Sequence, residues 1–89
     1  MAYKILLHPK ANKFLEKNKT VIRGRIKNKL KVLKNFPDRK GNHLRYTPFY
    51  ELRIGEYRAI YEIDYKEKKV IVLFIGHRKN VYDNFSKLF

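Results

Sequence analysis

The sequence predicts an α+β fold in which two N-terminal helices pack on a four-stranded antiparallel sheet. Two observations support this prediction. Apolar residues recur at helical spacing in the first half of the chain, and in the second half they alternate with polar residues or form short runs. The 89 residues suffice for one domain, and no linker rich in Gly, Pro or Ser divides them. We therefore expect residues 1–89 to form a single β-α-α-β-β-β domain with a short C-terminal helical tail.

The first half of the chain is expected to contain one strand and two helices. Residues Tyr3–Leu7 mix β-branched, aromatic and apolar types, which is typical of a strand. Pro9 suits the first turn of a helix, and a short helix is expected from there. A longer helix begins at Thr20, a suitable N-cap, and ends at Pro37. Its apolar stripe is formed by residues at steps of three and four: Ile22, Ile26, Leu30, Leu33 and Phe36.

The second half changes to the period of a strand. After a turn over Asp38–Asn42, the stretches Phe49–Ile54 and Tyr57–Tyr65 alternate in polarity, with a tight Gly-Glu turn between them. Val70–Ile75 is continuously apolar, as expected of a central strand with both faces covered. The short turns make these three strands an antiparallel meander. The helices then cover one face and leave the other more open. A C-terminal helical tail is marked by Val81, Tyr82, Phe85 and Leu88.

The charge balance points to a polyanionic partner. There are 22 Lys and Arg residues against 8 Asp and Glu, which gives a formal charge of +14. Such an excess weakens a fold through self-repulsion unless a partner neutralises it. Nucleic acid is the first candidate, before an anionic membrane surface or an acidic protein, because phosphate neutralisation releases counterions.

Several other classes are excluded by composition. The chain has no cysteine, so it has neither disulfides nor a thiolate metal site, and its three histidines are not at zinc-binding spacing. We expect no metal and no cofactor. No apolar run is long enough for a signal peptide or a membrane span, so a soluble, cytoplasmic protein is expected.

Basic and aromatic residues of the second half form a candidate site. Arg53 and Arg58 lie on adjacent strands, and both point away from the apolar face. Arg78 follows the last strand, and Tyr82 comes four residues later. Guanidinium groups bind phosphate oxygens bidentately, and tyrosines stack on unpaired bases. Two further basic residues flank the loop before the meander and are candidate RNA-binding residues: Lys40 and Arg45.

Each candidate also has a purely structural interpretation. Arg58 could form a cross-strand ion pair with Glu56 or Glu62, and Arg53 could pair with Glu51 or remain solvated. Tyr82 could serve only packing. His77, at the end of a strand, could be structural or could move protons near neutral pH. From the residues alone, the sequence indicates a basic α+β domain that binds nucleic acid.

Four stretches carry a resemblance to a known family. They are YELRIGEYRAIYE (Tyr50–Glu62), IGHRKNVY (Ile75–Tyr82), HPKANKFLEK and GNHLRYTPF. In these the chain resembles the RelE branch of the RelE/ParE toxin superfamily, whose RelE-type members are mRNA interferases. The resemblance implies an endoribonuclease that enters the ribosomal A site, cuts mRNA and so inhibits translation. The implied reaction is a metal-independent attack of the ribose 2′-OH on the adjacent phosphate.

The resemblance also implies roles for individual residues. Arg58 matches the arginine that holds the scissile phosphate, and Arg78 matches the arginine near the leaving 5′-oxygen. Tyr82 matches the C-terminal aromatic that orients the nucleotide and shares in proton transfer. Arg53 stands where relatives carry a lysine that is a candidate base.

The proton acceptor is therefore open. Arginine does not readily deprotonate, so Arg53 is a poor base. Glu51, which also stands where some relatives have lysine, or His77 could accept the proton. Otherwise the reaction relies on orientation and electrostatics.

Two other functions remain as alternatives, a ParE-like poison of DNA gyrase and a basic RNA-binding module without activity. Both toxin interpretations imply an acidic, RelB-like antitoxin in a hetero-oligomer, which blocks the basic face or displaces the tail Val81–Phe89. The nuclease hypothesis also makes a geometric demand. Two guanidiniums and one phenol must gather around a single RNA linkage, free of ion pairs in the monomer.

Overall fold

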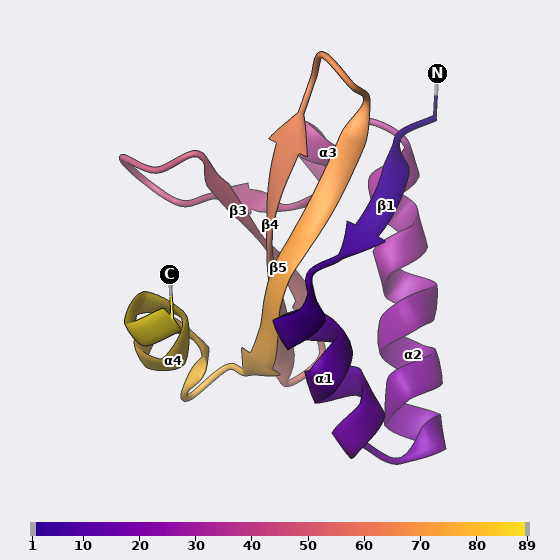
Figure 1. The fold of residues 1–89 in the computed structure, drawn as a ribbon, viewed down its shortest axis with the longest axis vertical. Coiled ribbons are helices and arrows are strands. Elements are labelled where there is room, and N and C mark those ends of the chain that lie inside the picture. The colour runs from indigo at the N-terminus through magenta and orange to yellow at the C-terminus, as the bar shows by residue number, and fades with distance from the viewer. Residues whose placement is uncertain (1, 89) are drawn as a thin grey trace.

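A five-stranded mixed sheet forms the centre of the computed structural model, which describes residues 2–88 (Figure 1). The strands lie in the order β1-β5-β4-β3-β2. In chain order the elements are β1 (Lys4–Leu7), α1 (Pro9–Lys17), α2 (Thr20–Leu30), the 3₁₀ helix η1 (Lys31–Lys34), α3 (Pro37–Lys40), β2 (Asn42–His43), β3 (Phe49–Ile54), β4 (Tyr57–Asp64), β5 (Lys69–His77) and α4 (Val81–Leu88).

The α+β class, the two N-terminal helices and the antiparallel β3-β4-β5 meander are confirmed, but two details of the sheet differ from the prediction. β1 pairs with β5 in parallel, from Lys4 opposite Lys69 to Leu7 opposite Val72. No hairpin joins these strands, so no turn dictates their relative direction. β2 is an additional two-residue strand paired with β3, where a turn was expected. Two residues are too few to show a period in the sequence.

The end of the second helix was also predicted wrongly. α2 stops at Leu30, and one 3₁₀ turn follows before the chain reaches Pro37. Pro37 begins α3 instead of ending α2, because proline is tolerated in the first turn of a helix. Phe36 has left-handed backbone angles (φ 50°) and is 60% exposed, so it lies outside the buried stripe. Lys19, not Thr20, is the N-cap residue of α2.

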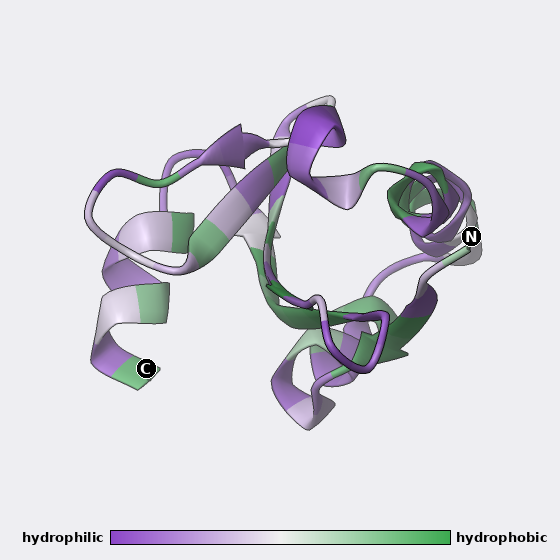
Figure 2. Cartoon of the chain, turned by 90° about the horizontal axis from the view of Figure 1, so that it is seen from above, coloured by the Kyte–Doolittle hydropathy of each residue, from purple (hydrophilic) through white to green (hydrophobic). Residues whose placement is uncertain are grey.

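The main core lies between the sheet and the first two helices. Figure 1 shows α1 and α2 on one side of the strands and α4 on the other. In Figure 2 the hydrophobic colour lies mainly along the strands, whereas the outer loops are hydrophilic. Apolar residues of α1 and α2 interdigitate with alternate residues of the strands. The buried members of this core are Ala11, Leu15, Ile26, Leu30, Leu33, Leu52, Ile54, Ala59, Tyr61, Val70, Val72 and Ile75.

The opposite face of the sheet carries a smaller cluster under α4. Val81 and Phe85 of the helix pack on Ile60 and Leu73 of the strands. The ring of Phe85 meets that of Phe49 edge-on, with centroids 5.2 Å apart. α4 thereby covers part of the face that the sequence left open. Across residues 2–88, every helix falls short of the length and apolar character that a membrane span requires.

Candidate functional site

The candidate residues lie where the sheet narrows to three strands. Within the described part of the chain, β1 pairs with β5 only as far as Val72, and β2 pairs only with Tyr50 and Glu51 of β3. Beyond these points β3, β4 and β5 continue alone. Arg53 lies directly opposite Arg58 there, and Arg58 lies opposite Gly76 of β5. Register therefore places both arginines in one row of the face that carries α4.

A buried carboxylate holds the two arginines. The Oε1 atom of Glu51 lies 3.7 Å from Nε of Arg58 and 3.8 Å from Nε of Arg53. The Glu51 side chain is 7% exposed, that of Arg58 13% and that of Arg53 70%. Nη1 of Arg58 donates to the carbonyl oxygens of Gly55 and Tyr57, both at 2.9 Å. Like charges directly opposite each other destabilise a sheet, and the carboxylate offsets this repulsion.

The ion pair of Arg58 is not the one considered from the sequence. Its partner is Glu51 instead of Glu56 or Glu62, because Glu51 lies diagonally across the β3-β4 register, within reach of a long side chain. The demand that Arg58 be free of ion pairs is thus not met. The 3.7 Å separation is longer than the roughly 2.8 Å of a charge-assisted hydrogen bond. Glu51 therefore contacts Arg58 as a charge, while the hydrogen bonds of its Nη1 go to the backbone.

Arg78 and Tyr82 lie at the same end of the sheet. The backbone N–H of Arg78 donates to the carbonyl oxygen of Glu56 at 2.7 Å, which ties the segment after β5 to the β3-β4 turn. A Cβ atom at Gly76 would touch the first residue of α4, so this helix begins against the strand position opposite Arg58. Tyr82 is the second residue of α4 and is 44% exposed. The topology thus brings Arg58, Arg78 and Tyr82 to the same end of the sheet.

His77 lies on the other face of the sheet. It is paired with Tyr57, and the two rings meet edge-on with centroids 5.9 Å apart. Tyr57 in turn packs against Phe14 of α1. Nε2 of His77 lies 3.8 Å from the carboxylate of Glu56, and Nδ1 accepts a hydrogen bond from a backbone N–H. The structure therefore does not bring this imidazole to the Arg53–Arg58 row.

The two candidate RNA-binding residues of the loop are exposed but separate from the arginines. Arg45 lies before β3, at the opposite end of this six-residue strand from Arg53. At about 3.3 Å per residue, the two ends of the strand are about 17 Å apart. Lys40 ends α3, next to β2 at the outer edge of the sheet. Arg45 therefore lies near the other end of β3 from Arg53.

The pKa values of two tyrosine hydroxyls are raised. Burial raises the pKa of Tyr61, whose hydroxyl donates to the Pro37 carbonyl oxygen at 2.7 Å. The hydrogen bond between the hydroxyls of Tyr50 and Tyr65 raises the pKa of Tyr65 to about 12. Neither hydroxyl is a proton acceptor near neutral pH. Within residues 2–88, no three acidic or histidine side chains gather as metal ligands would.

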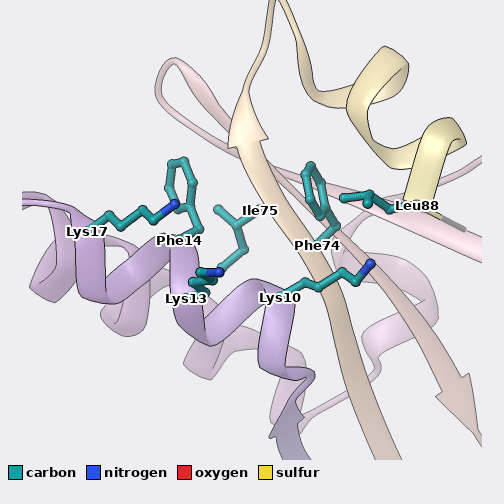
Figure 3. A pocket seen from close by; sticks show the side chains of 7 residues that line it. All are labelled: Lys10, Lys13, Phe14, Lys17, Phe74, Ile75 and Leu88. Atoms are coloured by element: carbon teal, nitrogen blue, oxygen red, sulfur yellow. The ribbon is translucent and has the colours of Figure 1, made fainter.

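An apolar groove of about 350 Å³ runs between α1, β5 and α4 (Figure 3). Phe14, Phe74, Ile75 and Leu88 form its apolar surface. Three lysines project from one side of α1 along its rim: Lys10, Lys13 and Lys17. Sequence analysis missed this groove, because its walls come from three elements whose packing no periodicity encodes.

Comparison with known proteins places this fold in a family. The family model of the ParE toxin of type II toxin-antitoxin systems (parDE) matches residues 5–82. No curated protein sequence matches the chain.

Solved structures give further matches. A mutant of the E. coli toxin RelE in the free state, with two arginines changed to alanine, is 29% identical, with a TM-score of 0.79 over 100% of this chain and 99% of that one. The toxin–antitoxin complex RelBE2 from Mycobacterium tuberculosis is 27% identical, with a TM-score of 0.78 over 88% of this chain and 93% of that one. The intact E. coli RelBE toxin–antitoxin complex is 29% identical, with a TM-score of 0.74 over 85% of this chain and 96% of that one.

Proposed function

The chain belongs to the RelE/ParE superfamily of type II toxins, and we propose that it is a ribosome-dependent endoribonuclease that cuts messenger RNA in the A site. The observation that supports this proposal is the row of Arg53 and Arg58, with Arg78 tied to the turn beside it. A cytoplasmic enzyme of this kind would inhibit translation. Its partner would be the ribosome with bound mRNA.

The proposed reaction needs no metal or cofactor. The ribose 2′-oxygen forms a bond to the adjacent phosphorus, the bond from phosphorus to the 5′-oxygen breaks, and a 2′,3′-cyclic phosphate results. The 2′-OH loses a proton, and the 5′-oxygen gains one. Arg58 binds the scissile phosphate and stabilises its developing charge, Arg78 stabilises the leaving 5′-oxygen, and Tyr82 orients the nucleotide. Fixed cations facing a developing charge are an effective form of catalysis.

We assign Glu51 a positioning role in this reaction. It is the candidate acceptor that shares a face with the arginines, whereas His77 does not. Its carboxylate is buried and contacts two guanidiniums. This environment suits a group that holds Arg58 in place better than it suits a base that takes a proton from RNA. Arg53 keeps its proton and adds charge. The reaction then relies on orientation and electrostatics.

The nuclease proposal requires RNA to compete with Glu51 for Arg58. Glu51→Gln keeps the shape of the side chain and removes its charge. RNA affinity should then rise, because the phosphate no longer competes with a carboxylate, while the cleavage rate of bound RNA should fall, because Arg58 is less well fixed. The measurements are binding of an uncleavable 2′-deoxy-substituted RNA and single-turnover cleavage on ribosomes. Unchanged values in both would remove Glu51 from the site.

The central test compares Arg58→Ala and Arg78→Ala with Arg39→Ala, an exposed arginine of α3. Each site variant should lower ribosome-dependent cleavage by about 10²-fold or more, as loss of a charge-stabilising group does, while circular dichroism stays unchanged. Primer extension on mRNA bound to ribosomes measures the cuts. If both site variants cut like the wild type, the assigned site is wrong.

The same preparations separate the alternatives. A ParE-like gyrase poison would cause gyrase-cleaved DNA to accumulate and leave mRNA intact. A binding module without activity would bind RNA in a salt-sensitive manner and give no product.

We further propose a RelB-like antitoxin as the partner in a hetero-oligomer. Several similar RelE structures are complexes with RelB. The +14 charge calls for an acidic partner, and the lysine-rimmed groove fits an amphipathic segment that carries carboxylates beside apolar residues. Leu88 of α4 lines the groove, so a segment bound there contacts the tail whose displacement is one of the two modes of inhibition considered. Phe89, the last residue of that tail, lies outside the described residues.

A further inference from the structure

A second cleft, of about 470 Å³, lies at the edge of β3. Arg25, Asn28 and Lys29 of α2 face Arg53, Ile54 and Gly55 across it. The first three are three and four residues apart and so share one side of the helix. Arg53 and Ile54 are consecutive in a strand and point to opposite faces of the sheet, so the cleft wraps around the edge that β2 leaves uncovered.

The cleft is strongly cationic. Its described walls contain two arginines and a lysine and no carboxylate. Among the described residues, the ion pairs include neither Arg25 nor Lys29, and that of Arg53 is with Glu51, outside the cleft. Three cations around one cavity repel one another, and an anion in the cavity would relieve this repulsion.

Arg25 is not extended into solvent like an ordinary surface side chain. Its guanidinium lies so close to the turn that a Cβ atom at position 55 would collide with it. Gly55 has left-handed backbone angles (φ 59°) and lacks the side chain that would occupy this place. The turn therefore accommodates the guanidinium of Arg25 in the cleft that Arg53 also lines.

We propose that this β3-edge cleft binds a second phosphate of an RNA backbone, next to the phosphate held at Arg58; the inference rests on the proposed nuclease function. Arg53 lines the cleft and also lies opposite Arg58, about 5 Å away between Cα atoms of such a pair. A phosphodiester strand presents phosphates in series, as this pair of sites requires. Arg53 then serves as a phosphate-binding bridge, and Arg25 and Lys29 complete the second site.

The test uses the double variant Arg25→Gln/Lys29→Gln. Its matched control is Lys27→Gln/Lys31→Gln, which removes the same charge from exposed positions of α2 and η1 outside the cleft. The probe is a short single-stranded RNA with a 2′-deoxy sugar at the cleavage position, measured by fluorescence anisotropy over a salt series. Loss of the contact with this second phosphate should reduce the magnitude of the slope of log K against log salt by about 0.7 and weaken binding about fivefold at 0.1 M salt. The control should change much less.

Two arms identify the source of the phosphate. If it belongs to the bound strand, a neutral methylphosphonate next to the scissile linkage weakens wild-type binding but adds no loss in the double variant. If it belongs to ribosomal RNA, the double variant binds the oligonucleotide normally and loses affinity for ribosomes. Either result supports the cleft as a phosphate site.

Other outcomes overturn the inference. Equal behaviour of the double variant and its control in both arms refutes the cleft. So does a loss of affinity for the acidic antitoxin with RNA and ribosome binding intact, which would make the cleft a protein-binding surface. Failure of the proposed function is separate, because the wild type itself would then give no cuts in mRNA on ribosomes.

Discussion

The sheet face under α1 and α2 and the face that carries α4 are covered to very different extents. In the described chain, twelve buried residues form the core on the first face, against four in the cluster on the second. The first face holds buried apolar groups and one buried phenol, that of Tyr61. The second holds the buried carboxylate of Glu51 between two arginines. The difference indicates that one face supplies most of the stability, and that the thinner cover of the other leaves room for a charged site.

The largest expected effect is on the helix-covered face. Ile26→Ala removes a fully buried side chain of the main core and should lower the free energy of unfolding by about 2–5 kcal/mol. Phe85→Ala should act mainly on α4, which packs on the sheet through one small cluster, and should loosen this helix locally. Urea denaturation measures the first effect, and hydrogen exchange of the α4 amides measures the second. An equal loss of global stability in both variants would show that the two faces contribute equally to the free energy of unfolding.

A smaller effect is expected from a single buried hydroxyl. Tyr61 is fully buried, and its O–H donates to the Pro37 carbonyl oxygen at 2.7 Å. Tyr61→Phe should cost about 1–3 kcal/mol, because that carbonyl loses its donor away from water. Tyr82→Phe on the other face, where the ring is 44% exposed, should change stability by less than about 0.5 kcal/mol. Thermal and urea unfolding near pH 7 compare the two.

The same hydroxyl makes stability depend on alkaline pH. Burial raises the pKa of Tyr61 above its ordinary value of 10.0, so the folded state keeps a proton that the unfolded state loses. The stabilisation is fully present below pH 10 and is lost as the pH rises from there toward the folded-state pKa. One such proton gives a slope of about −1.4 kcal/mol per pH unit. Tyr61→Phe should remove this part of the slope between pH 10 and 11, and an unchanged slope would contradict it.

The contrast between the faces also shows what the sequence can predict of the fold. Elements with a clear period were predicted correctly, because residues such as Ile26 and Leu30 repeat along one side of a helix. The parallel direction of β1 was not predicted, since it depends on contacts between the two ends of the chain. Phe36 fits the helical period by spacing alone, yet the backbone turns before Pro37 and leaves it exposed.

For the site, alternation placed Arg53 and Arg58 correctly on one face. It could not indicate that Glu51 would be buried in an ion pair with Arg58, since that arginine comes from the neighbouring strand. The sequence did not assign His77 to a face of the sheet, because the last strand was expected to end before this residue. In the structure β5 includes it. Arg25 looked like part of a solvated helix face, and only the approach of the β3-β4 turn distinguishes it.

The smallest expected effects distinguish a glycine of α2 from the glycine of the β3-β4 turn that lines the cleft. Gly24 lies in α2, and a Cβ atom there would meet nothing within 4 Å, so Gly24→Ala should stabilise the protein by about 1 kcal/mol through helix propensity. Gly55 has φ 59° and the guanidinium of Arg25 in the place of a Cβ, so Gly55→Ala should destabilise by roughly 1–2 kcal/mol. The second change also pushes Arg25 away from Arg53. RNA affinity should therefore fall in Gly55→Ala and stay constant in Gly24→Ala. The reverse pattern would show that the β3-β4 turn does not position Arg25 for RNA binding.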